Sequence, residues 1–320
     1  MEMYPLIFEP ILKDRIWGGT KLKTYLGKDI PNDTTGESWE LSAVPGDISI
    51  VKEGKYKNKP LSELLYVYPE EILGDKIYGR FGIQFPLLFK FLDAHDKLSI
   101  QVHPNDDLAK KRHNSFGKTE MWYVMQADED SSIIVGFKEK SSPDEYLAHL
   151  KDKNLPEILN EIKVKKGDVF LLETGTIHAI GAGIVIAEIQ QTSDITYRIY
   201  DWDRVDAQGK SRELHVEEAL DAMNYNLTDT QKQYSKTENQ SNVMVGCPYF
   251  TTAYLPLNGS IAVGKDGSSF TVYVCTDGDF VINAGGKEYA FKKGDTVLMP
   301  AIIKDFTLTG NATLLEIYIS

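Results

Sequence analysis

Two side chains able to bind a metal lie two residues apart in the chain, at Gln101 and His103. The segment 98–103 alternates apolar and polar residues and ends at Pro104, as a half-buried strand does. Side chains two apart on a strand share a face, so the amide and the imidazole would point the same way. Taken alone, the pair is explained better by a core histidine hydrogen-bonded to a glutamine. It predicts a metal site only if the chain supplies more ligands.

Further ligands are present downstream. In the predicted strand 117–125, Lys118 and Glu120 share one face, and Glu120 is either half of a surface ion pair or a third ligand. His178 lies among small residues at 174–183, where backbone segments can approach closely. Two imidazoles, a carboxylate and an amide suit Zn²⁺, although Mn²⁺, Co²⁺ and Fe²⁺ also accept them, and a single anionic ligand leaves the ion electrophilic. The predicted set, for one metal per chain, is Gln101, His103, Glu120 and His178.

Other charged residues lie in apolar surroundings. Lys90 interrupts the apolar segment 85–94, so its ammonium must either reach solvent at an edge strand or meet an anion. Glu188 lies on a predicted strand, and Arg198 follows four residues after Asp194. The Asp194–Arg198 pair is either an oriented guanidinium or a surface salt bridge. These residues are candidates for acid–base chemistry and for binding an anion.

The composition describes an ordinary globular protein. The 320 residues are enough for two domains or one large one, with 42% hydrophobic residues and a formal net charge of −12. That charge argues against a nucleic-acid-binding surface, and no apolar run is long enough for a membrane span. Two cysteines are too few for a disulfide framework, and the first residues lack the pattern of a signal peptide. We expect a cytoplasmic protein that is a monomer or a homodimer.

The elements that must position these residues are short strands, and they are repeated. Short apolar bursts separated by Gly and Pro predict a mainly β fold with a few short helices. The segment 165–171 is echoed by 292–298, each with a Gly-Asp turn, and 186–189 resembles 314–317. The duplication predicts two antiparallel jelly-roll barrels, over residues 1–235 and 236–320.

The second copy lacks the predicted ligands. Aligning Tyr123-Val124 with Tyr273-Val274 puts Phe270 in the place of Glu120, and counting from the Gly-Asp turns puts Asp305 in the place of His178. Nothing in the second copy resembles the Gln-x-His pair. The C-terminal barrel is therefore predicted to be metal-free and structural.

The ligand segments carry a resemblance to a known family. The motifs Gln101-Val102-His103-Pro104-Asn105, Lys118-x-Glu120 and Gly175-x-x-His178-Ala179 resemble the zinc-site motifs of type I mannose-6-phosphate isomerases, which belong to the cupin superfamily. The resemblance extends over most of the first 220 or so residues and includes the Trp17-Gly18-Gly19 and Phe89-Lys90 segments. It is to the compact bacterial members, and it reaches the C-terminal barrel more weakly.

The resemblance implies a function and a set of roles. It implies interconversion of mannose 6-phosphate and fructose 6-phosphate through an enediol, with Zn²⁺ on the four predicted ligands. Arg198 matches the family's catalytic arginine, and either Glu188 or Lys118 would move the proton. The residues that would bind substrate are Lys90, Ser99, Trp17 and Asp194. From the residues alone, the tryptophan segments 15–19 and 35–42 indicate ordinary packing.

Two other classes of function fit parts of the pattern. A cupin with a His/His/Glu set can be an Fe²⁺ dioxygenase, but the amide ligand, the lysines and the arginine fit that chemistry less well. A non-catalytic sugar-binding cupin would bind ligand without turnover. Retention of the ligands in only one barrel favours catalysis.

Overall fold

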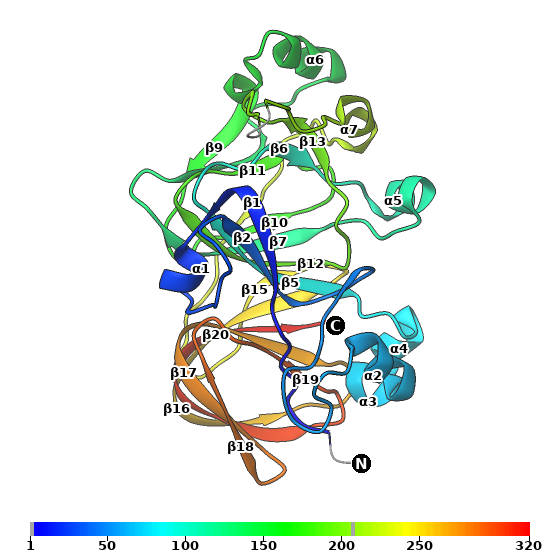
Figure 1. Cartoon of the computed structure of the whole chain (residues 1–320), viewed down its shortest axis with the longest axis vertical. Helices are drawn as coiled ribbons and strands as arrows, with labels where there is room; N and C mark the ends of the chain where they lie inside the picture. Colours follow the sequence, from blue (N-terminus) through cyan, green and yellow to red (C-terminus); the bar gives the residue numbers. More distant parts are fainter. Residues whose placement is uncertain (1–2, 206–208) are drawn as a thin grey trace.

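The computed structural model describes residues 3–205 and 209–320, and the fold is mainly β, as predicted (Figure 1). All strand pairs described are antiparallel, and they form open jelly-roll sheets rather than closed barrels. The first part of the chain supplies two of the sheets. In spatial order, the seven-stranded sheet contains β1 (Ile11–Gly19), β2 (Thr35–Leu41), β5 (Leu87–Ala94), β12 (Ile184–Gln191), β7 (Glu120–Ala127), β10 (Val169–Leu172) and β14 (Gln231–Lys232). The five-stranded sheet contains β13 (Tyr197–Tyr200), β6 (Ile100–Val102), β11 (His178–Ile180), β8 (Ser132–Phe137) and β9 (Leu159–Lys163).

The last part of the chain forms a six-stranded sheet, drawn in yellow to red in Figure 1. Three of its strands run for 14 residues each and supply most of the pairing. A separate pair, β3 (Ala43–Val44) and β4 (Asp47–Ile48), forms a small ribbon. The six strands are β15 (Asn242–Gly246), β16 (Thr251–Gly264), β20 (Asp305–Tyr318), β17 (Thr271–Ala284), β18 (Lys287–Lys292) and β19 (Thr296–Met299).

The helices are short and lie outside the sheets (Figure 1). Asn105 and Ser142 cap two of them by accepting hydrogen bonds from backbone N–H groups of the first turn. The helices are α1 (Lys21–Thr24), α2 (Leu61–Val67), α3 (Pro69–Leu73), α4 (Asp75–Phe81), α5 (Asp106–His113), α6 (Pro143–Lys151) and α7 (Val216–Ala222), with a 3₁₀ turn, η1 (Leu155–Ile158). No helix among the described residues is long and apolar enough to cross a membrane.

The three large sheets are stacked in layers, which explains the sequence of the central strands. One face of the seven-stranded sheet packs on the five-stranded sheet through Trp122, Ile186 and Val135. Its other face packs on the C-terminal sheet in a core that includes Phe89 and Val272. Because β5 and β12 are covered on both faces, every residue in them is buried and their sequences are almost continuously apolar.

The N-terminal and C-terminal parts share that second core. Leu6 forms a β-bridge with Leu298, and the rings of Phe85 and Phe270 lie 4.8 Å apart between centroids. Sheet membership changes between β14 and β15, so the chain enters the C-terminal sheet after Lys232. The boundary at 235/236 itself stays a prediction.

The repeat is visible in the structure, with one correction. Gly167 and Gly294 occupy matching turns with φ of 92° and 91°, and their N–H groups donate to the carbonyls of Val124 and Cys275. Val124 therefore corresponds to Cys275 rather than to Val274. The sequence alignment was one residue out of register, and the position of Glu120 is occupied by Thr271, not by Phe270.

Candidate metal centre and its pocket

The candidate site lies between the seven-stranded and five-stranded sheets. On β5, β12 and β7 the even-numbered residues face the five-stranded sheet, as Leu92, Ile186 and Trp122 do in the shared core. By the same alternation, the polar residues Lys90, Glu188 and Glu120 face inward, as do Gln101, His178 and Arg198 on the five-stranded sheet.

Strand register brings three of the predicted residues into one row. His178 pairs with Gln101 across β11 and β6, and Gln101 pairs with Arg198 across β6 and β13. Directly paired residues in an antiparallel sheet have neighbouring side chains. The fold thus places a metal ligand between a second ligand and the predicted catalytic arginine, although 77 residues separate Gln101 from His178 along the chain.

The structure brings the predicted metal ligands together. Candidate ligand atoms of His103, Glu120 and His178 all lie within 4.8 Å of one another, and all three residues are buried. The Nε2 atoms of His103 and His178 lie 3.4 Å and 3.5 Å from the two carboxylate oxygens of Glu120. Gln101 Nε2 lies 3.2 Å from His178 Nε2, and exchanging the amide nitrogen and oxygen would direct the oxygen toward the same centre.

The hydrogen bonds of the two imidazoles fit a metal-binding role. His103 Nδ1 lies 2.9 Å from the Ile195 carbonyl oxygen, and His178 Nδ1 lies 2.7 Å from that of Thr176. A carbonyl oxygen accepts only from a protonated nitrogen, so each Nδ1 carries the hydrogen and each Nε2 offers a lone pair. Such contacts fix the tautomer and the ring orientation of histidine ligands in metalloproteins.

The protonation states of His103, His178 and Glu120 are also those that a metal site requires. Burial is the main cause that lowers the pKa of both imidazoles, to about 3 for His103, so both rings stay neutral. Burial alone would raise the pKa of Glu120, but chiefly Lys118 holds it well below its usual value. Neither oxygen of this buried carboxylate accepts a well-formed hydrogen bond within the described part of the chain, and its one close cation is Lys118. A buried carboxylate with so few donors around it suits a divalent cation.

Lys118 lies at the border between this centre and a pocket. Its Nζ atom is 2.9 Å from Glu120 Oε2 and 3.0 Å from His103 Nε2, and its side chain also lines the pocket. Burial would lower the pKa of Lys118, but Glu120 and Glu188 more than offset this, and the pKa is raised. The surface ion pair considered for Lys118 and Glu120 is therefore a buried one.

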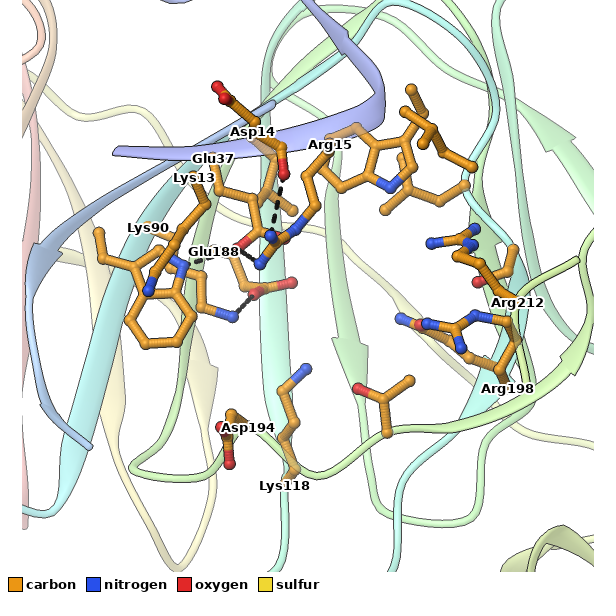
Figure 2. Close-up of a pocket in the computed structure, with 18 of the residues that line it drawn as sticks. Lys13, Asp14, Arg15, Glu37, Lys90, Lys118, Glu188, Asp194, Arg198 and Arg212 are labelled. Atoms are coloured by element: carbon orange, nitrogen blue, oxygen red, sulfur yellow. Dashed lines mark hydrogen bonds and ion pairs between the residues drawn. The ribbon is translucent and has the colours of Figure 1, made fainter. Parts of the chain in front are cut away.

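The pocket has a volume of about 600 Å³, and charged side chains line it on several sides (Figure 2). Lys90 Nζ lies 3.1 Å from Glu188 Oε1, while the indole N–H of Trp122 donates to Glu188 Oε2 over 2.9 Å. Because β5 lies between β2 and β12, Lys90 is not on an edge strand. Of the two possibilities for Lys90, solvent at an edge strand or a buried anion, the structure shows the second, with Glu188 as the anion.

The predicted substrate-binding residues all line this pocket: Lys90, Ser99, Trp17 and Asp194 do so together with Arg198. Ser99 and Trp17 are buried in its wall, whereas Asp194 is exposed. Arg198 Nη1 donates to the Glu213 carbonyl oxygen over 3.0 Å, and Asp194 lies across the pocket (Figure 2). The idea that Asp194 orients Arg198 finds no support in this arrangement.

Part of the pocket wall was not predicted from the sequence, namely Arg15, Glu37, Trp39 and Arg212. Arg15 donates from Nε to Glu37 Oε1 over 2.8 Å, and the indole N–H of Trp39 donates to Glu37 Oε2 over 2.6 Å. Lys90 Nζ lies 4.9 Å from the centroid of the Trp39 ring. A signal was present, because Glu37 and Trp39 share one face of β2, although ordinary packing is the interpretation that the residues alone favour for segment 35–42. Arg212, also in the wall, had no such signal.

The chain is similar to a family of sugar-phosphate isomerases over nearly its whole length. Residues 6–133 match the family model described as phosphomannose isomerase type I, catalytic domain, and residues 239–319 match the mannose-6-phosphate isomerase cupin domain. The chain is 39% identical over 313 residues to a mannose-6-phosphate isomerase of Streptococcus mutans, with 97% of each chain covered. The chain belongs to the type I phosphomannose isomerase family.

Other members of the phosphomannose isomerase family support the assignment. A mannose-6-phosphate isomerase of Bacillus subtilis is 38% identical, with 98% of each chain covered. A crystal structure of the mannose 6-phosphate isomerase from Bacillus subtilis superposes with a TM-score of 0.91 at 36% identity, covering 99% of this chain and 100% of that one. The resemblance seen in the ligand motifs is thus confirmed over nearly the whole chain, including the C-terminal part.

Proposed function

We propose that this member of the phosphomannose isomerase family is a metal-dependent aldose–ketose isomerase that interconverts mannose 6-phosphate and fructose 6-phosphate. One observation carries the proposal. A buried His/Glu/His cluster, whose Nε2 lone pairs face its centre, lies next to Lys118, and Lys118 lines a pocket together with Glu188 and Arg198. Its full-length relatives carry the name of this activity.

The residues that would hold the metal are Gln101, His103, Glu120 and His178. The donor set of two neutral imidazoles, one carboxylate and one amide fits Zn²⁺ best, and we propose one Zn²⁺ per chain. When bound, such an ion would polarise the oxygens of the open-chain sugar and acidify the carbon-bound hydrogen between them. The chain's own residues must then move the proton and stabilise negative charge.

Two residues can carry the proton between C1 and C2. Glu188 is held by Lys90 and by the indole of Trp122, with its carboxylate on the pocket wall. Lys118 also lines the pocket, with its Nζ 2.9 Å from Glu120 Oε2. The neighbouring carboxylates raise its pKa, and the charge of a bound metal would lower it toward the range that a base requires. The structure offers both groups, and we propose that one of them transfers the proton to form the enediol and returns it to the adjacent carbon.

Arg198 is placed to stabilise the enediolate. It is the strand neighbour of Gln101, and its side chain lines the pocket. The enediolate carries negative charge that the open-chain sugar lacks. A fixed guanidinium therefore stabilises the transition state more than the ground state.

The alternatives remain distinguishable. An Fe²⁺ dioxygenase would consume O₂, and a sugar-binding cupin would bind without turnover. The six cationic side chains of the pocket wall suit an anionic substrate better than O₂ chemistry; they are Lys13, Arg15, Lys90, Lys118, Arg198 and Arg212. Turnover separates the isomerase from a sugar-binding cupin.

A coupled assay tests the proposal. The purified chain is stripped of metal with a chelator, reloaded with Zn²⁺, and assayed for fructose 6-phosphate formed from mannose 6-phosphate. We expect turnover to disappear on stripping and to return on reloading, without O₂ uptake. Binding of the sugar phosphate without turnover by the loaded chain would refute the proposal. Cytoplasmic location and a monomeric or homodimeric state remain predictions.

A further inference from the structure

Positive charge that is not matched by a carboxylate gathers on one wall of the pocket. On the other walls, each cation has a carboxylate of its own within the described part of the chain. Figure 2 shows Arg198 and Arg212 side by side, across the pocket from Lys90 and Glu188. The matched pairs are Lys13 with Asp47, Arg15 with Glu37, Lys90 with Glu188 and Lys118 with Glu120.

The arginine wall has fewer anions than cations. Arg198 donates to a backbone carbonyl, and its buried Nε has no partner among the described residues. Arg212 donates from Nε and Nη2 to the two oxygens of Asp201, over 2.7 Å and 2.5 Å. Asp201 Oδ1 also accepts a hydrogen bond from Arg204 Nη2, over 2.6 Å. Asp201 is thus shared by two guanidinium groups, although Arg204 also pairs with Asp96 at 3.6 Å. Arg198 has no carboxylate partner within the described part of the chain.

This arrangement both fixes Arg212 and leaves it charged toward the pocket. Asp201 binds the Nε–Nη2 edge of Arg212, so the remaining Nη1 group is the one available to a ligand. Figure 2 shows the two guanidinium groups side by side, and burial, followed by repulsion from the Arg212 cation, lowers the pKa of Arg198. A dianion placed at this wall would relieve that repulsion.

We propose that Arg212, held by Asp201, is the anchor for the phosphate group of the substrate. The inference rests on the proposed function, since it assigns the end of the sugar phosphate that is remote from the metal ligands. Arg198, the strand neighbour of Gln101, would contact the reacting end of the sugar. Arg212 lies beside it on the same wall and would contact the phosphate. A planar guanidinium that is fixed along one edge suits a phosphate, because little side-chain freedom is lost on binding.

The test compares two arginines that share the same carboxylate. Arg212→Gln should raise the KM for mannose 6-phosphate by about 10- to 100-fold, as expected for loss of a charge-assisted contact, with kcat changed less than about 3-fold. Arg204→Gln disturbs the same Asp201 but removes no charge from the pocket wall, so its KM should stay within about 3-fold of wild type. Inorganic phosphate, used as a competitive probe, should weaken in parallel with the KM of Arg212→Gln.

The outcomes separate this inference from the proposed function. Equal KM increases in both variants, or a fall in kcat with unchanged KM in Arg212→Gln, would overturn the phosphate anchor while leaving the isomerase intact. If the wild type shows no turnover, the proposed function fails, and calorimetric binding of inorganic phosphate to wild type and variant still tests the anchor. Should Arg212→Gln fail to fold, Arg212→Lys replaces it. A lysine that restores wild-type KM would then contradict recognition by the guanidinium fork.

Discussion

At the scale of single residues, the site combines two neutral imidazoles, a buried carboxylate paired with Lys118, and several fixed cations. The protonation state of each group follows from its immediate surroundings. Backbone carbonyls select the Nε2 lone pairs of His103 and His178, and burial keeps both rings neutral. Arg198 is the residue whose role can be separated most cleanly, because it contacts the pocket without belonging to the ligand cluster.

Replacing Arg198 with alanine should lower kcat by roughly 10²- to 10³-fold, as removal of a single oxyanion-stabilising donor typically does. Metal content should stay at the wild-type level, and KM should change much less than kcat. Arg198→Lys should rescue poorly, because lysine offers a point charge on a different stem. A steep rise in KM at unchanged kcat would instead make Arg198 a phosphate anchor.

At the scale of elements, the ligands depend on how loops are tied to strands. Asp106, at the start of α5, accepts hydrogen bonds from Gly117 N and Gln191 Nε2, over 2.8 Å and 2.9 Å. It also accepts one from the hydroxyl of Tyr249, over 2.7 Å, which joins the C-terminal part of the chain to this loop. The segment that carries Lys118 and Glu120 is thus held from three directions.

Asp106→Ala should therefore damage both stability and catalysis. Loss of these partially buried contacts should lower the free energy of unfolding by about 1–3 kcal/mol, and displacement of the Lys118–Glu120 segment should reduce kcat. Denaturant unfolding and steady-state kinetics measure the two effects. Asp107→Ala is the matched control, because this neighbour lies exposed in the same helical turn. Equal effects from both variants would show that Asp106 acts only through the helix terminus.

How far the sequence predicts these elements depends on the range of the interactions. Period-two alternation and the almost wholly apolar segment at 85–94 are local signals, and the strands they predict are present. The segment 142–162 begins with the helix-start signal Ser142-Pro143, but α6 ends at Lys151 and the strand β9 begins at Leu159. There, pairing of β9 with β8 overrides the local pattern. Arg212 could not be predicted, because its place in the wall depends on a side-chain contact with Asp201, 11 residues earlier, which no periodic pattern indicates.

At the scale of the whole molecule, the N-terminal and C-terminal parts share a strand arrangement but carry different side chains at corresponding positions. Glu188 pairs across strands with Trp122, and Glu316 pairs in the same way with Tyr273, whose hydroxyl donates to Glu316 Oε1 over 2.8 Å. In the C-terminal copy the carboxylate is satisfied by Lys265 and Ser241. Within the described part of the chain, that copy holds no group of three potential metal ligands. It packs against the seven-stranded sheet through their shared core, and its purely structural role stays a prediction.

The buried Glu316 cluster predicts a specific pH dependence of stability. Burial would raise the pKa of Glu316, but Lys265 and the hydrogen bonds lower it below the ordinary value of 4.5. A carboxylate with a lowered folded-state pKa stabilises the fold above pH 4.5, and that contribution is lost as the pH falls through the folded-state pKa. Glu316→Gln should therefore be less stable than wild type at pH 7 and should lose less stability on acidification. Thermal unfolding between about pH 3 and pH 7 measures this.

Glu288→Gln is the control for the pH experiment, because Glu288 is an exposed carboxylate on the same sheet. It should follow the wild-type curve. A Glu316→Gln variant whose stability falls with acid as steeply as that of wild type would show that the cluster does not control acid unfolding.

The central claim is that His103, Glu120 and His178 hold the metal on which turnover depends. The most direct test measures bound metal and kcat together in His178→Ala, with Asp305→Ala as the corresponding change in the C-terminal copy. We predict one metal per chain in wild type and in Asp305→Ala, and loss of both metal and turnover in a folded His178→Ala. Full turnover by a His178→Ala protein verified to be metal-free would contradict the account.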